Sequence, residues 1–494
     1  MSVSNPKTFA APPAAATAAS KTGTEAGATP RLSGRLGVAS IVLIVVAAAS
    51  PLGVIGGTVP LAIASGNGAG LPFIYLLATA ILLLFAVGFT AMTPHVPSAG
   101  AFFSYVEKGL GRRAGLGAAF VALLSYLALE AGVYGLFAPA VDEVVRAYGG
   151  PGLPWWVWAA AALVAVAWLG HRNIELSGKV LAVLLVAEVL IVLVLDAAIV
   201  FGGGGAEGLS TGFLTPSTVL SGAPGIALLF AILSFIGFEA TAVFRDEARD
   251  PDKTIPRATY LALLVVGGFY ALSSWLLISV WGDTGIVQKA TDAPGTLLSE
   301  TTALYLGTAG SHIVQVLLAT SLFACILSFH NISSRYFFQL SGQGIFPATL
   351  AGTHVRHRSP HRASAAATAV VVLFLLVAVV AGWDPIVQFY TWFAGFSSLG
   401  VVVLMTLTSV AVLVFFRRQG APAGSWKRSV APALGLLGLL GILGLILQNL
   451  PTLVGNSVPL AIAVVVLILA SFGAGAVVAA RRPQATAGAA PSSC

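Results

Sequence analysis

The chain has 494 residues, of which 57% are hydrophobic and only 9% are charged, and its mean hydropathy is +0.94. A soluble domain carries about 25% charged residues, so this composition excludes a soluble protein and predicts an all-α polytopic membrane protein. Apolar runs of about 20 residues recur along the chain, which suits helices that cross a hydrocarbon core of about 30 Å, and they lack the alternation of barrel strands. The two cysteines exclude a disulfide framework.

The chain begins with residues 1–33, which are rich in Ala, Thr, Ser, Pro and Gly and predict a disordered cytoplasmic tail. No cleaved signal peptide is expected, because the first apolar run starts only after Arg35 and is too long. Residues 482–494 predict a second disordered tail. Twelve membrane spans are predicted between the tails: 36–63, 72–92, 114–138, 155–169, 176–201, 222–243, 259–281, 311–340, 363–382, 385–416, 429–450 and 457–480.

The distribution of basic residues agrees with this count and predicts an orientation, because Lys and Arg concentrate on the cytoplasmic side. With the amino terminus inside, 23 of the 25 Lys and Arg residues fall in inside segments or at inside helix ends, and only Arg146 and Lys289 fall outside. Both termini are then cytoplasmic, and the expected location is the cytoplasmic membrane. The pattern also argues against nucleic acid as a partner, because the net charge of +7 is a topology signal.

Four carboxylates fall inside the predicted spans, at Glu130, Glu188, Asp196 and Glu239, whereas no Lys or Arg lies near mid-membrane depth. An ionised carboxylate in hydrocarbon costs about 2.5 kcal/mol or more. Carboxylates without fixed cations invite a mobile one: a proton, a metal ion or a positively charged substrate group. A structural role is favoured for Asp196, which is predicted close to the outer surface. The structural alternative for Glu239 is a hydrogen bond that joins two helices.

Two of the predicted spans carry helix-breaking residues near mid-membrane depth. The sixth span carries Gly237 within the segment SFIGFE. Residues 47–62 of the first span contain Pro51, Gly53, Gly56, Gly57 and Pro60. These two spans come first in two blocks of five, and interrupted segments at corresponding positions of two halves indicate the binding site of an inverted-repeat transporter. Separate proline kinks and small-residue packing are the alternative.

Backbone groups that are freed at such breaks have chemistry suited to an α-amino acid. A half-helix that begins near Gly57 and Thr58 would offer N–H groups and a positive dipole end to a carboxylate. Carbonyl groups opened around residues 50–53 and 235–237 would accept hydrogen bonds from an ammonium group. A zwitterion fits both ends without any buried fixed charge.

Three segments of the chain carry sets of residues that resemble the motifs of a known superfamily. Residues 85–115 include Pro97, Ala99, Gly100 and Tyr105; residues 234–258 include Glu247, Pro251, Ile255, Pro256 and Ala258; residues 329–347 include Asn331, Arg335, Gly344 and Pro347. They are similar to the segment after helix two, the helix-six break with its following loop, and the end of helix eight in one superfamily. Together they resemble the amino acid–polyamine–organocation (APC) permeases, and the resemblance covers about residues 36–416.

This resemblance implies a LeuT-type fold, with ten helices in a five-plus-five inverted repeat over residues 34–416 and two additional helices over residues 417–481. It implies secondary active import of amino acids or related amines, often with protons. No cofactor and no metal site are expected. On this basis the substrate site is the backbone at Gly53, Val54, Ile55, Gly56, Gly57, Ser234, Phe235, Ile236 and Gly237.

The resemblance also nominates coupling residues. Glu239 matches a helix-six glutamate implicated in proton coupling in some relatives. Several proton-coupled relatives carry a helix-five lysine that faces the site, and the approximately matching position here is Glu188. This departure leaves the coupling ion open between H⁺, which we expect, and Na⁺. Glu130 is the third coupling candidate.

Aromatic residues supply candidate gates. An aromatic gate found in helix six of antiporters would fall at Leu233, which weakens an antiporter interpretation. For aromatic side chains, packing or anchoring at the membrane interface is the more common role. The candidates are Tyr126 and Tyr134 in the third span and Tyr390, Trp392 and Phe393 in the tenth.

Three function classes remain open. The first, which we predict, is a proton-coupled amino acid symporter, with a small-molecule substrate and the lipid bilayer as its partners. The second is a carrier of an amine or polyamine that uses Glu130, Glu188 and Glu239 as ammonium ligands. The third is a membrane enzyme or nutrient sensor, and the lack of an HExxH pair, a P-loop and a CxxC motif argues against an enzyme. The seven histidines mostly fall at membrane edges or in a basic loop, which is typical of a solvated face rather than a zinc site.

Overall fold

A computed structural model of the chain describes residues 36–96, 102–172, 178–244, 248–352, 360–420, 422 and 424–481. Both predicted tails lie outside these residues, and so do the motif positions Pro97, Ala99, Gly100 and Glu247. The described residues are almost entirely helical, with two isolated bridges and no β-strand among them. This is the architecture of an all-α polytopic membrane protein.

The helical elements follow one another along the described chain with short connections. Their bounds are α1 Val38–Ala48, α2 Pro51–Gly53, η1 Val54–Thr58, α3 Val59–Ala62, η2 Ile63–Asn67, η3 Gly68–Gly70, α4 Leu71–Met92, η4 Thr93–His95, α5 Phe102–Leu110, α6 Arg112–Ala147, α7 Trp155–Arg172, α8 Gly178–Phe201, η5 Gly212–Leu214, α9 Pro216–Val219, α10 Pro224–Leu233, α11 Ala240–Val243, α12 Pro251–Trp281, α13 Gly285–Asp292, α14 Leu297–Gly342, η7 Ala348–Ala351, α15 His361–Val380, η8 Pro385–Tyr390, α16 Thr391–Arg418, η9 Trp426–Val430, α17 Ala431–Leu453 and α18 Val458–Arg481.

Nine helical segments in the described part of the chain are long and apolar enough to cross a membrane. One of them, Val38–His95, contains the first two predicted spans together. The short apolar helix α10 belongs to the broken sixth span, and α7 falls outside the nine because tryptophans and the terminal His171 and Arg172 lower its hydropathy. Each of the twelve predicted ranges contains helix among its described residues, and twelve crossings in a five-plus-five repeat stay a prediction.

The first predicted span opens at Ser50, whose φ of 49° and ψ of 67° are left-handed. Pro51 explains the position, because proline disfavours helical geometry in the residue before it and lacks the N–H that would continue the helix. The chain is helical again from Pro51, through a π-helical turn over Val54–Thr58, into α3. The half-helix therefore begins at Pro51, and the expectation that it begins near Gly57 and Thr58 is wrong.

The sixth predicted span breaks where the sequence predicts it. α10 ends at Leu233 and α11 begins at Ala240. Between them the chain makes turns that are closed by hydrogen bonds between residues three apart in sequence, such as the 3.0 Å bond from the Phe235 N–H to the Ile232 carbonyl. Gly237 has a φ of 112°, which only glycine adopts readily. The break predicted at Gly237 is confirmed.

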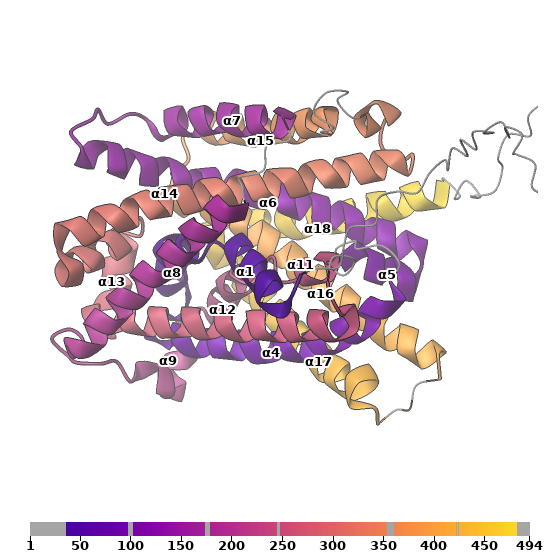
Figure 1. The fold of residues 1–494 in the computed structure, drawn as a ribbon, viewed down its shortest axis with the longest axis horizontal. Helices are drawn as coiled ribbons and strands as arrows, with labels where there is room; N and C mark the ends of the chain where they lie inside the picture. Colours follow the sequence, from indigo (N-terminus) through magenta and orange to yellow (C-terminus); the bar gives the residue numbers. More distant parts are fainter. Residues whose placement is uncertain are drawn as a thin grey trace, which may run out of the picture. The chain divides into compact units, whose positions relative to one another are not determined.

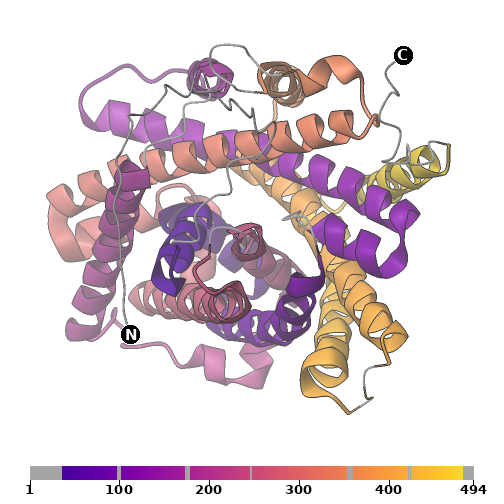
Figure 2. The same cartoon turned by 45° about the vertical axis from the view of Figure 1, so that its right-hand side comes forward.

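Two groups of helices pack around the broken spans. In the first group α4 packs along α12, and α1 lies against α12; in the second α6 packs along α14, and α7 and α15 pack against both. Figure 1 shows α7 and α15 beside α14 and α6, with α12 and α4 on the other side of the broken helices. In Figure 2 the indigo helices of the first span lie between α14 and α12. The two breaks are thus enclosed by other helices.

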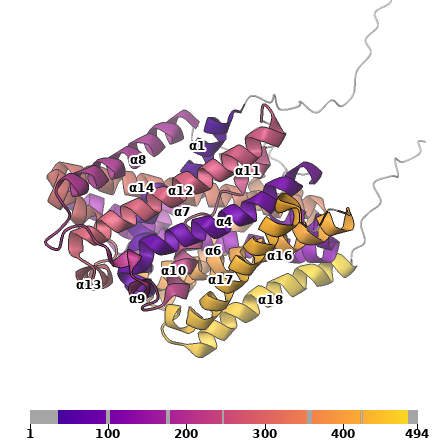
Figure 3. The ribbon, with the colours of Figure 1, turned by 90° about the horizontal axis from the view of Figure 1, so that it is seen from below.

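The last two helices lie against this core rather than within it. α17 packs against α4, α10 and α16, and α18 packs along α6, as Figure 3 shows along one edge of the molecule. Glycines permit the close approach: a Cβ on Gly475 of α18 would lie only 2.4 Å from the carbonyl oxygen of Leu116 in α6. The site is therefore built from the elements that precede α17.

Candidate substrate and coupling site

The two breaks border a small cavity of about 40 Å³, which has room for roughly three water molecules at about 10–15 Å³ each. No charged side chain among the described residues lines it. Its polar lining consists of Ser50, Thr58, Cys325 and Tyr390, and the Tyr390 and Thr58 hydroxyl groups are hydrogen-bonded at 2.7 Å. Its apolar lining includes Leu129, Val133, Leu233, Ile236 and Phe329.

Glu188 of α8 caps the half-helix that begins at Pro51. Its buried carboxylate accepts a hydrogen bond from the backbone N–H of Leu52 and a 2.7 Å bond from the Ser321 hydroxyl of α14. The Ser321 hydroxyl lies 2.8 Å from that of Ser50, the residue at the break. Exposed N–H groups and the dipole at a helix start favour a negative charge. A carboxylate of the protein itself thus occupies the kind of position that the sequence suggested for the substrate carboxylate.

Glu239 caps the break in the sixth span. Its Oε2 accepts a 2.9 Å hydrogen bond from the Gly237 N–H, and its Oε1 accepts a 2.9 Å bond from the Tyr126 hydroxyl of α6. The Tyr126 ring lies between Phe329, at 6.1 Å between centroids, and Tyr336, at 5.7 Å, both on α14. Glu239 therefore both closes a local turn and joins the sixth span to α6.

Glu130 faces away from the cavity. Its Oε1 lies 2.8 Å from His330 Nδ1, and the other ring nitrogen of His330 lies 2.8 Å from the Ser364 hydroxyl of α15. The preceding residue on each helix, Leu129 or Phe329, lines the cavity instead. Glu130 and His330 are both fully buried, so they form a polar contact behind the cavity wall.

A second cavity, of about 330 Å³, lies next to the first. Leu136 and Leu322 line both cavities, so these two side chains form the partition. Gly56 and Gly57 also line the second cavity, and Glu143 contributes a carboxylate whose Oε1 accepts 2.7 Å hydrogen bonds from Ser299 and Gln315.

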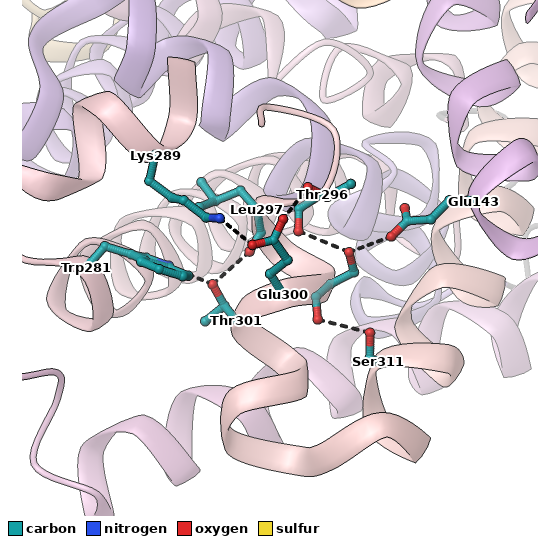
Figure 4. A network of polar contacts seen from close by, with 9 residues as sticks. Glu143, Trp281, Lys289, Thr296, Leu297, Glu300, Thr301 and Ser311 are labelled. Carbon is teal, nitrogen blue, oxygen red and sulfur yellow. Dashed lines mark hydrogen bonds and ion pairs between the residues drawn. The ribbon is translucent and has the colours of Figure 1, made fainter. Parts of the chain in front are cut away.

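The start of α14 forms a polar network beside Glu143, shown in Figure 4. Lys289 is paired with Glu300, and its ammonium group lies 4.8 Å from the centre of the Trp281 ring. The Trp281 ring N–H donates a 2.9 Å bond to Thr301, and Ser311 donates to the Ser299 carbonyl at 3.0 Å. These contacts fix the helix start that borders the second cavity.

The predicted backbone positions divide between the two cavities. Gly53, Val54 and Ile236 line the first cavity, and Gly56 and Gly57 line the second. The remaining four predicted positions border neither of these two cavities: Ile55, Ser234, Phe235 and Gly237. Ser234 instead donates a 2.9 Å bond to the Phe230 carbonyl and lies 3.1 Å from the Tyr75 hydroxyl.

The predicted gate residues also separate. Tyr390 lines the first cavity, and Tyr126 holds Glu239 beside it. Trp392 packs on Trp383, with ring centroids 5.0 Å apart, and borders neither described cavity. Tyr134 is fully buried in α6, and the Phe393 ring packs on Phe374 and Phe389.

Sequence reasoning missed most of the cavity wall. Leu129, Val133 and Leu136 follow one another at helical spacing on α6, and Leu322, Cys325 and Phe329 do so on α14. This spacing places each set on one face of its helix. This spacing could have indicated the cavity wall in the sequence, but both helices carry apolar residues on their other faces as well.

A family model for amino acid permeases matches residues 36–475. The chain belongs to the amino acid permease family. This confirms the resemblance to the APC superfamily and makes the protein a multi-pass membrane transporter rather than an enzyme. It is 28% identical to an uncharacterized transporter of Mycobacterium tuberculosis over 82% of this chain and 84% of that one.

Two further relatives have names that state a substrate. A probable GABA permease of Pseudomonas aeruginosa is 27% identical over 61% of this chain and 64% of its own. The low-affinity putrescine importer PlaP of Escherichia coli is 22% identical over 58% of this chain and 63% of its own.

Proposed function

We propose that this permease imports an amino acid across the cytoplasmic membrane by proton symport, with both termini in the cytoplasm. The observation that carries the proposal is the Glu188 carboxylate on the Leu52 N–H, at the start of the half-helix that lines the cavity. The coupling ion is a proton, because an ionised carboxylate buried at membrane depth is costly and one proton makes it neutral. We propose H⁺ rather than Na⁺, and no other cofactor.

Coupling follows from competition at one helix start. The substrate carboxylate and the Glu188 carboxylate are both attracted to the N–H groups and dipole of the half-helix at Pro51. Two negative charges in one buried site repel each other, so one carboxylate is favoured in the neutral form. Protonation of Glu188 removes its charge and lets the substrate carboxylate bind there. Proton and substrate therefore bind together.

Contacts on the two sides of the cavity supply the gates. On the side of the second cavity, the Thr58–Tyr390 hydrogen bond and the side chains of Leu136 and Leu322 close the path. On the other side, the Tyr126–Glu239 bond joins the sixth span to α6, beside the aromatic contacts of Tyr126 on α14. Transport then needs two alternating states. In one, the contacts beside the second cavity are open while the Tyr126–Glu239 contact stays closed; in the other, the Tyr126–Glu239 contact is open while the contacts beside the second cavity stay closed.

The second candidate is an amine or polyamine permease in which buried glutamates bind ammonium groups. The name of the putrescine importer favours it. The contacts of Glu130, Glu188 and Glu239 argue against it, because each carboxylate already has hydrogen-bond partners within the protein.

The test is uptake of a labelled amino acid panel and putrescine into proteoliposomes, with and without an imposed inward proton gradient. Gradient-driven accumulation of an amino acid is the expected result. Accumulation of putrescine alone would replace the proposal by the amine carrier. Accumulation of an amino acid only with an inward Na⁺ gradient would contradict proton coupling.

A further inference from the structure

We propose that the substrate of this permease has a small, uncharged, aliphatic side chain, and that Val133 limits its size. This inference deepens the proposed function, on which it rests, because it treats the 40 Å³ cavity at the two breaks as the substrate site.

The cavity lining combines polar groups with apolar side chains. The first span contributes Ser50 and Thr58, η8 contributes Tyr390 and α14 contributes Cys325. α6 contributes only apolar side chains, from Leu129, Val133 and Leu136. A zwitterionic head group matches the hydroxyl groups of the lining, and an aliphatic side chain of the same molecule matches the apolar side chains of α6.

Charge excludes the ionised amino acids and the diamines. No described charged residue lines the cavity, and burial of a charge without a partner is costly. The three nearby carboxylates are already bonded within the protein: Glu130 to His330, Glu239 to Tyr126 and Gly237, and Glu188 to Leu52 and Ser321. A second ammonium group on the substrate would find none of them available.

Space favours a small side chain. The cavity measures about 40 Å³, and its walls already touch the half-helix: a Cβ on Gly53 would lie 3.1 Å from Leu322, and one on Gly57 would lie 2.5 Å from Leu136. Val133 and Leu129 are one helical turn apart on α6, so they form one continuous patch of the apolar wall. Val133 is β-branched and stiff, which makes its methyl groups a fixed limit.

The binding test uses Cys325, which lines the cavity. The protein used carries Cys494→Ser, because Cys494 is the other of the two cysteines in the sequence and would also be alkylated. Alkylation of Cys325 by N-ethylmaleimide is followed by mass spectrometry, without any ion gradient, in the presence of alanine, valine, leucine, arginine, glutamate or putrescine. Cys325→Ala gives the background signal. We expect alanine, valine and leucine to slow the alkylation, and arginine, glutamate and putrescine to leave it unchanged.

Protection by arginine, glutamate or putrescine equal to that by valine would overturn the inference, and so would protection by none of the six. Neither result depends on proton coupling, since no gradient is applied. Conversely, if valine protects Cys325 from alkylation but no amino acid is taken up with a proton gradient, the symport proposal would be wrong while this inference would still hold.

The size limit is tested by Val133→Ala and Val133→Ile, with Val121→Ala as the matched control. Val121 is a buried valine of the same helix that does not line the cavity and packs near Gly400 of α16. One methylene in an apolar pocket changes discrimination by about tenfold or more. We therefore expect the ratio of leucine to alanine protection to rise about tenfold in Val133→Ala and to fall in Val133→Ile. An unchanged ratio in both variants, or an equal change in Val121→Ala, would contradict the assignment.

Discussion

The breaks in the first and sixth spans differ in the origin of their caps. Glu239 lies two residues after Gly237, and its carboxylate accepts a 2.9 Å hydrogen bond from the Gly237 N–H. One short segment therefore supplies both the bend and its cap. The break at Ser50 is capped instead by Glu188, which comes from α8 and also accepts from Ser321 of α14. A local cap stabilises its turn independently of the neighbouring helices. A distant cap joins three elements, so a change of its charge acts on the packing among them.

The largest effect on stability is expected where the backbone itself requires glycine. Gly237→Ala forces a residue with a Cβ to adopt a φ of 112°, so we expect a loss of about 2–3 kcal/mol in the free energy of unfolding. Gly268 of α12 is the control, because nothing lies within 4 Å of a Cβ there, and its change to alanine should be neutral or stabilising. Thermal unfolding in detergent measures both, and equal midpoints for the two variants would contradict the local account of this break.

A smaller effect is expected from the contact that joins the sixth span to α6. Tyr126→Phe leaves Glu239 Oε1 without its donor, which should cost about 1–2 kcal/mol. Tyr134→Phe on the same helix is the control, because the buried Tyr134 hydroxyl has no partner among the described residues. Unfolding midpoints that fall only in Tyr126→Phe would support the contact, and a similar fall in both would argue against it.

The smallest effect is expected at the opposite side of the cavity. Thr58→Val removes the 2.7 Å hydrogen bond to Tyr390, a loss of about 1 kcal/mol. This should favour opening toward the second cavity and raise the rate of Cys325 alkylation about fivefold, which is the equivalent of that free energy. Thr408→Val is the control, since its buried hydroxyl has no partner within the described chain. A faster rate in the control would assign the effect to general loosening.

The sequence predicted the features that depend on neighbouring residues. Gly237 and Glu239 are close in sequence, so their break and cap could be anticipated, and Pro51 determines the break at Ser50. Because of the glycines at positions 53, 56 and 57, the start of the half-helix was predicted too far along the chain. They are helical, and two of them pack closely under leucine side chains: Gly56 under Leu318 and Gly57 under Leu136.

The cavity wall could not be predicted from the sequence. α6 is buried on nearly all sides, so it lacks the polar face that would show which residues turn inward. Leu129 and Glu130 are neighbours, yet one lines the cavity and the other contacts His330. The partnership of Glu188 with Leu52 likewise joins residues far apart in the chain, and only the packing of α8 against α2 brings them together.

The central claim is that the distant cap, Glu188, carries the coupling proton, and Glu188→Gln tests it most directly. Glutamine keeps an acceptor for the Leu52 N–H but cannot gain or lose a proton. The measurement compares gradient-driven accumulation with gradient-free exchange of the same labelled amino acid in proteoliposomes, with Glu239→Gln as the parallel variant. We predict that Glu188→Gln keeps exchange but loses at least about tenfold in accumulation and all dependence on external pH, while Glu239→Gln still accumulates substrate. Accumulation by Glu188→Gln that equals the wild type and keeps its pH dependence would contradict the account.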